Sequence, residues 1–400
     1  MFRRSGAGNG DRRRGDRPCT RGGIFTHRWL LAVTLAVATA VTVAPALAGG
    51  DDDRREDDRD RGGRNAIVKR PVTFTVQNVN RSLLPCATDG REYRIRGHIV
   101  GPRGGLRNAD AATLYLHGLE AGEFFWTQEA YGASFVERQA RDGHVSVVID
   151  RLGYDSSGKP DGFQSCLGGQ ADIANQIVDQ LRDGDYAVGG RRSAPSFEQV
   201  VLGGHSVGGL LTELTAISFD NVDGIIVASY SDTVLSDAAK AAAAANARMC
   251  AAGGTRTEGG AFPGGYAPFA PTLAGFQAAF FLSATPDLVD ATSELRNLNP
   301  CGDTGTFMAG AQTNVRFIGQ IKVPVLVIIG EEDALFPPPA GPTQAALFTG
   351  TQDVTLRTLS PSSHAVTVEQ TAPQFSRQIS RWLDDHGFGR GERDRDSDDR

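Results

Sequence analysis

The five residues 204–208 have the types and the spacing of a nucleophilic site, because they read Gly-His-Ser-Val-Gly. A β-branched run precedes them, and the leucines that follow recur at helical spacing, so the segment predicts strand, tight turn and helix. In such a turn the serine has a strained backbone, and both glycines are needed because strand and helix pass closely. The motif is short and the chain holds 49 glycines. Its flanks, more than the motif itself, therefore make Ser206 the candidate nucleophile.

A base and an acid for this serine follow later in the chain. A serine hydroxyl is a poor nucleophile unless a neutral imidazole accepts its proton during attack. His364 is the only late histidine placed just after a predicted core strand, residues 354–359. Asp333 follows the preceding strand and would hold the imidazole in the required tautomer. Asp232 and Glu332 remain alternatives for the acid, and a surface position remains an alternative for His364.

Two backbone amides are expected to complete the site. The apolar strand 112–116 ends in His117-Gly118-Leu119, and a loop in that position commonly lends an N–H group to an oxyanion hole. The predicted donors are Leu119 and Val207, the residue after the nucleophile. The following aromatic run, residues 124–126, predicts either the wall of an acyl pocket or packing beneath the loop.

The remaining pattern describes the elements that must position these residues. Alternating residues between 68 and 100 predict an antiparallel opening, and the helix-length segment 130–142 between two strands predicts a parallel crossover. Further elements are predicted over 145–150, 173–181, 222–229, 323–330 and 372–386. The alternation stops between about 233 and 320, which predicts a cap over the carboxyl edge of the sheet.

Together these pieces resemble the α/β-hydrolase superfamily over residues 68–386. The matching segments are 116–118, 150–154, 204–208, 324–333 and His364. The resemblance implies an α/β fold with a mostly parallel central sheet, helices on both faces and a cap insertion, and the chain order Ser, Asp, His that this fold uses. It argues against the aspartate-dependent dehalogenases and epoxide hydrolases, since the nucleophile is a serine. Asp155 departs from the superfamily's usual glycine.

The two ends of the chain differ from its middle. Arginines precede the apolar run 29–43, and Ala46-Leu47-Ala48 supplies small residues at cleavage spacing, which predicts a signal peptide over 1–48, cleaved near Ala48. The run is shorter than the ~20 residues of a membrane span, so no stable membrane anchor is expected. Residues 49–66 and 387–400 are strongly charged and predict disordered flanks of one domain, 67–386. The net charge of −6 gives no indication of nucleic-acid binding.

The cysteines agree with export. Cys19 lies in the leader, and the even count that remains predicts two disulfides with three possible connectivities. We pair Cys250 with Cys301, because both lie in the insertion, and Cys86 with Cys166. No pair has C-x-x-C spacing and no histidine lies near them, so a metal site is not expected, and no cofactor motif occurs.

The expected function is that of a secreted serine hydrolase that cleaves carboxylic esters through an acyl-enzyme, with a small-molecule ester as its substrate. A peptidase of the same fold is the alternative, with Asp287, Asp290 or Glu294 in the cap to bind an amino terminus. A secreted binding protein on a hydrolase scaffold is a further alternative, although such a protein would normally lack one member of the triad. The sequence does not indicate an oligomeric state.

Overall fold

The computed structural model describes residues 66–190, 193–255 and 263–389. The predicted signal peptide, nearly all of the predicted charged linker and residues 390–400 of the predicted tail lie outside the described residues. The strands are β1 (Ile67–Gln77), β2 (Glu92–Pro102), β3 (Ala111–Leu116), β4 (Ser146–Ile149), β5 (Ala187–Val188), β6 (Gln199–His205), β7 (Gly224–Ala228), β8 (Tyr266–Ala267), β9 (Asn299–Pro300), β10 (Val325–Gly330) and β11 (Val354–Leu359). The α-helices are α2 (Gly105–Asn108), α3 (Phe124–Thr127), α4 (Phe135–Arg141), α5 (Leu167–Asp183), α6 (Val207–Phe219), α7 (Asp237–Ala251), α8 (Leu273–Phe280), α9 (Pro286–Glu294), α10 (Cys301–Phe317), α11 (Ala340–Ala345) and α12 (Ala372–Asp385). Short 3₁₀ turns cover Ala130–Gly132, Gly162–Gln164 and Ile318–Gln320.

The predicted antiparallel opening is confirmed. β1 and β2 pair over their whole length, from Ile67 opposite Pro102 to Gln77 opposite Glu92. Val72, Phe74 and Val76 are buried on one face, because alternate residues of a strand point to the same side. The two-residue strand β5, which pairs with β1 outside it, was not predicted.

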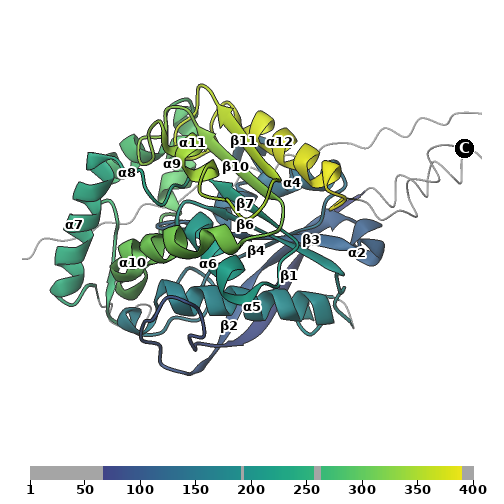
Figure 1. Ribbon diagram of the computed structural model, residues 1–400, viewed down its shortest axis with the longest axis horizontal. Coiled ribbons are helices and arrows are strands. Elements are labelled where there is room, and N and C mark those ends of the chain that lie inside the picture. The colour runs from purple at the N-terminus through teal and green to yellow at the C-terminus, as the bar shows by residue number, and fades with distance from the viewer. Residues whose placement is uncertain (1–65, 191–192, 256–262, 390–400) are drawn as a thin grey trace, which may run out of the picture. The chain divides into compact units, whose positions relative to one another are not determined.

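The central sheet has the order β11-β10-β7-β6-β3-β4-β2-β1-β5 in the described residues. From β11 to β4 each neighbouring pair is parallel. β3, β4, β7 and β10 are buried throughout because helices cover both faces of the sheet, whereas β11 at its edge is partly exposed. Helices α5, α6 and α10 pack together on one face, and α4 and α12 pack together on the other (Figure 1). The predicted α/β fold with a mostly parallel sheet is therefore confirmed.

The register of the parallel strands brings their carboxyl ends to one edge. Leu116 at the end of β3 lies opposite Gly204, and His205 at the end of β6 lies opposite Ala228. Gly330 at the end of β10 lies opposite Leu359 at the end of β11. The loops that start after these strands carry the residues predicted for catalysis, so the topology places all of them on the same side of the sheet.

The segment between β7 and β10, predicted as a cap, has two parts. Helix α7 begins at Ser236, whose hydroxyl accepts a hydrogen bond from the amide of Ala239 and caps the helix. Helices α8 and α9 and the antiparallel pair β8–β9 follow it. The last helix, α10, differs from these because it packs against α5 and α6 and so belongs to the helical layer of the core (Figure 1).

Both predicted disulfides are confirmed. Cys86 pairs with Cys166, just before α5, and Cys250 near the end of α7 pairs with Cys301 at the start of α10. The second bond joins the insertion to the core layer.

At the other end the packed chain continues past His386, where the tail was predicted to begin. Phe388 is buried against Trp382, with ring centroids 5.9 Å apart.

Candidate active site

Ser206 lies in a sharp turn between β6 and α6. Its backbone has φ 57° and ψ −125°, a conformation that non-glycine residues adopt only under strain. The turn is held by the Ser206 amide, which donates to the carbonyl of Ala228 at 2.9 Å. A Cβ at Gly204 would lie 1.9 Å from the carbonyl oxygen of Gly208, and one at Gly208 would lie 2.2 Å from that of Leu116. The two glycines of the motif are therefore required by the close approach of strand and helix, as predicted.

His364 and Asp333 meet in the loops after β11 and β10. The imidazole Nδ1 lies 2.9 Å from Asp333 Oδ2 and 3.2 Å from Oδ1, and both side chains are fully buried. Asp333 Oδ1 also accepts the amides of Leu335 and Phe336, at 2.9 and 3.0 Å. Donation from Nδ1 to a carboxylate leaves Nε2 as the basic nitrogen. Within the described residues Nε2 has no hydrogen-bond partner, so it is free to accept a proton.

A second histidine supports this arrangement. His205, the residue before the serine, donates from Nε2 to the carbonyl oxygen of His364 at 2.8 Å. Its ring stacks on Phe125 with centroids 4.0 Å apart. Complete burial, together with the neighbouring His364, lowers the pKa of His205 well below its usual value, so its ring is neutral. His205 thus holds the backbone of the histidine loop without adding a charge.

The two alternative acids lie away from His364. Asp232 accepts hydrogen bonds from Tyr230 at 2.6 Å and Gln344 at 2.9 Å, and burial raises its pKa. Glu332 accepts from the amide of Ser362 at 3.0 Å and the hydroxyl of Ser360 at 2.9 Å. Of the three candidate carboxylates, Asp333 is the one that contacts the imidazole.

The loop that carries Leu119 is fixed by a buried arginine. Arg151 Nε donates to the carbonyl of His117 at 3.0 Å, and Nη2 donates to that of Gly118 at 3.3 Å. Its Nη1 forms an ion pair with Asp303 of α10 at 3.0 Å. The amide of Arg151 donates to Nε2 of His117, whose pKa is lowered by burial and by the nearby guanidinium. Because these contacts hold the two residues before Leu119, its amide has a defined position.

Comparison with known proteins places the chain in a family. A model described as the alpha/beta hydrolase family matches residues 114–376. The chain belongs to this family. No curated protein matches the chain in sequence.

Solved structures of hydrolases share the fold. An esterase from Thermogutta terrifontis is 18% identical with a TM-score of 0.53, and covers 78% of this chain and 99% of its own. An esterase from Exiguobacterium antarcticum is 16% identical with a TM-score of 0.51, and covers 76% and 98%. A monoacylglycerol lipase from Paleococcus ferrophilus is 20% identical with a TM-score of 0.50, and covers 70% and 97%. At these identities the likeness shows the hydrolase fold alone.

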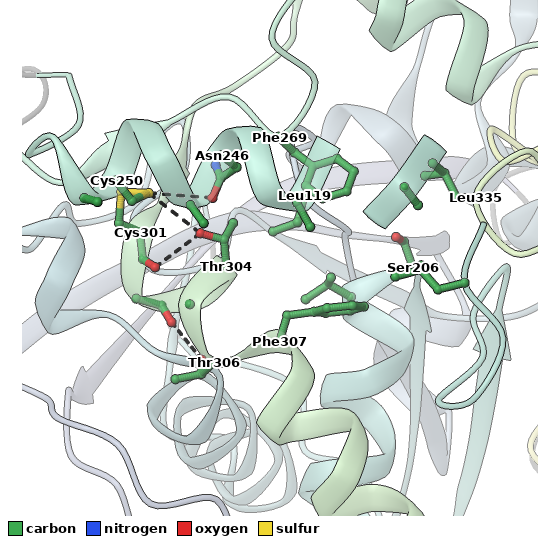
Figure 2. A pocket seen from close by; sticks show the side chains of 18 of the residues that line it. Leu119, Ser206, Asn246, Cys250, Phe269, Cys301, Thr304, Thr306, Phe307 and Leu335 are labelled. Atoms are coloured by element: carbon green, nitrogen blue, oxygen red, sulfur yellow. Dashed lines mark hydrogen bonds between the residues drawn. A yellow bond between two sulfur atoms is a disulfide. The ribbon is translucent and has the colours of Figure 1, made fainter. Parts of the chain in front are cut away.

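The turn at Ser206 opens into an apolar cavity of about 400 Å³. Ser206, Leu119 and Val207 all contribute to its wall, and Val207 is the first residue of α6, where backbone amides lack intrahelical partners. Figure 2 shows Ser206 at one end and the Cys250–Cys301 disulfide at the other. No charged side chain lines the cavity in the described part of the chain. The aromatic run 124–126 is buried but does not line it, so the packing alternative for that run is the one observed.

Among the described residues, no cluster of side chains suits a metal ion, and no helix is both long and apolar enough to cross a membrane.

The sequence pattern did not predict a buried carboxyl next to Leu119. Glu120 has φ 58°, and its Oε1 accepts the amides of Phe269 and Ala270 at 2.9 and 3.2 Å, besides facing Arg296 at 3.2 Å. Since the carboxyl is buried, its pKa is raised from 4.5 to about 7, although Arg296 opposes the shift. Glu120, the residue after Leu119, thus connects this loop to the insertion. Nothing in its local sequence marked it, because its partners lie far along the chain.

The raised pKa of Glu120 predicts a pH-dependent stability. Between pH 4.5 and 7 the folded protein binds more protons at this site than the unfolded chain, so the free energy of unfolding falls as pH rises through this window. A shift of this size corresponds to a contribution on the order of 3 kcal/mol. Denaturant unfolding of the wild type and Glu120→Gln at pH 5 and pH 8 measures it. We expect the free energy of unfolding to differ less between the two pH values in the variant than in the wild type. Equal differences would contradict the raised pKa of Glu120.

Proposed function

We propose that this protein is a secreted serine esterase that hydrolyses carboxylic esters of small molecules through an acyl-enzyme. The observation that carries the proposal is the Asp333–His364 pair, buried on the same edge of the sheet as the strained Ser206. A serine in such a turn, together with an imidazole whose Nε2 has no hydrogen-bond partner, has the groups needed for nucleophilic acyl transfer.

The residues take the following roles. Ser206 Oγ attacks the ester carbonyl while His364 Nε2 accepts its proton, and the amides of Leu119 and Val207 bind the oxyanion that forms. Collapse of the tetrahedral intermediate breaks the bond to the alcohol, which leaves with the proton from His364. A water molecule then gives its proton to His364 and attacks the acyl-enzyme, which releases the acid and restores Ser206. Asp333 keeps the imidazole oriented and stabilises its charged form.

Two features support export as part of the proposal. The chain begins with a basic leader followed by an apolar run and small residues, the pattern of a signal peptide cleaved near Ala48. Its two disulfides suit an oxidising compartment.

The apolar cavity favours esters over peptides. The carboxylates considered for binding an amino terminus, Asp287, Asp290 and Glu294, are exposed on α9 and do not line the cavity. We therefore expect kcat/KM for simple esters to exceed that for aminoacyl amides, measured on the mature chain with matched chromogenic leaving groups. Faster cleavage of any aminoacyl amide than of every ester would assign a peptidase instead, and no turnover of either would favour a binding protein.

A further inference from the structure

The cavity next to Ser206 is walled by the smallest side chains of α7. Ala239, Ala243 and Ala247 recur every four residues and so lie on one face of this helix, and all three line the cavity. Thr304, Gly305 and Phe307 of α10 form another part of the wall. In Figure 2 Phe307 lies between the end that holds Ser206 and the end that holds the disulfide. Short side chains on α7 leave an open path from the nucleophile along the helix.

The polar groups in this wall already have partners. Asn246 Nδ2 donates to the carbonyl of Pro268 at 2.9 Å, Thr304 Oγ1 to that of Cys301 at 3.2 Å, and Thr306 Oγ1 to that of Gly302 at 2.7 Å. Cys250 and Cys301 are joined in a disulfide. A polar ligand would lose hydrogen bonds to water and find few partners in this wall to replace them, whereas a hydrocarbon is stabilised by burial. The wall beyond Ser206 is therefore suited to an alkyl chain.

The length of the wall sets the length of that chain. From Ala239 to Cys250, α7 advances about 16 Å at about 1.5 Å per residue. With C–C bonds of about 1.5 Å, a zigzag chain advances about 1.25 Å per methylene, so about twelve carbon atoms cover this distance.

We propose that the face of α7 that lines the cavity, with α10 on the other side, is the acyl-chain site of this enzyme. This site selects unbranched acyl groups of about ten to twelve carbon atoms. The proposal rests on the proposed function. The site is assigned to the acyl group of the ester and not to the alcohol, because the acyl group stays bound through both steps. The alcohol must leave and be replaced by water. An apolar wall beside Ser206 suits the group that stays bound through both steps.

Two positions allow the site to be narrowed without disturbing the fold. A Cβ at Gly305 meets no atom within 4 Å, so Gly305→Leu places its side chain in open space. Ala243→Leu narrows the wall from α7. Ala241 is exposed, does not line the cavity and lies on the opposite face of the same helix, so Ala241→Leu is the matched control.

The test is a series of p-nitrophenyl esters from acetate to palmitate, which holds the alcohol constant. We expect kcat/KM to rise roughly threefold per methylene up to about dodecanoate, close to the value for full burial of each group. Gly305→Leu and Ala243→Leu should lower the dodecanoate-to-acetate ratio of kcat/KM at least tenfold, about the loss of two buried methylenes. Ala241→Leu should leave this ratio unchanged. A flat series, or a ratio that neither variant alters, would overturn the proposal.

A binding measurement separates this proposal from the proposed function. Dodecanoate is titrated calorimetrically into Ser206→Ala and into Ser206→Ala combined with Gly305→Leu. Binding that the second substitution weakens at least tenfold supports the acyl-chain site even if no ester is hydrolysed, in which case the proposed function alone fails. Ser206-dependent hydrolysis of acetate without dodecanoate binding leaves the esterase standing and overturns the site. A series of alkyl acetates checks the assignment to the acyl group, since a rise with alcohol length instead would also overturn it.

Discussion

Replacement of Ser206 by alanine is expected to lower kcat for ester hydrolysis by roughly 10⁶-fold, because the covalent step has no other nucleophile. The residue sits in a strained turn whose conformation is set by Gly204, Gly208 and the bond to Ala228, so the smaller side chain should leave the fold intact. The measurement is kcat with a p-nitrophenyl ester, alongside labelling by an alkyl phosphonate and mass spectrometry of the labelled peptide. Label is expected at Ser206 alone.

A neighbouring serine provides the control for this experiment. Ser229 is also buried and also has a positive φ, at 47°, and it follows the adjacent strand β7. Ser229→Ala should retain labelling and most of the activity. Activity that survives in Ser206→Ala, or phosphonate found on another residue, would rule out the assigned nucleophile.

The residues that could be predicted from the sequence are those whose local surroundings decide their structure. β11 was predicted with its observed limits, Val354–Leu359, because turn-forming residues lie on both sides of a short segment of β-branched and leucine residues. The turn at Ser206 was predicted because strand, glycines and helix are contiguous in the chain. The chain order of strands also predicted that Asp333 and His364 lie on the same edge of the sheet as Ser206, since parallel strands end on the same side.

Helix α10 was not predicted, because its sequence favours no regular structure. Glycine weakens a helix, and this segment contains Gly302, Gly305 and Gly310. Its stability comes from packing: a Cβ at Gly302 would lie 1.7 Å from the carbonyl oxygen of Ser165, so only glycine permits this approach. Part of the wall of the cavity belongs to this helix, and so does Asp303, the partner of Arg151. These features depend on contacts between distant segments and left no local pattern.

The choice of acid in the proposed triad also could not be decided from the sequence alone. Both Asp232 and Asp333 follow core strands on the same edge, so their spacing in the sequence permits either to reach His364. In the structure the two aspartates differ in their hydrogen-bond partners. Asp232 shares a buried cluster with Glu213 of α6, Asn314 and Gln344, whereas Asp333 contacts the imidazole.

Asp333→Asn is therefore expected to lower kcat by up to roughly 10⁴-fold, because an amide that donates to Nδ1 leaves the proton on Nε2 and removes the base. The asparagine oxygen can still accept the amides of Leu335 and Phe336, so the melting temperature should change little. Asp232→Asn is the matched control. Burial and the charge of Asp232 raise the pKa of Glu213 well above its usual value, and burial raises the pKa of Asp232. A neutral amide at position 232 therefore replaces a carboxyl whose ionisation burial already disfavours, and it should cost little activity. The measurement is kcat for each folded variant with one p-nitrophenyl ester. The opposite order of the two losses would transfer the role to Asp232 and contradict the orientation of His364 by Asp333.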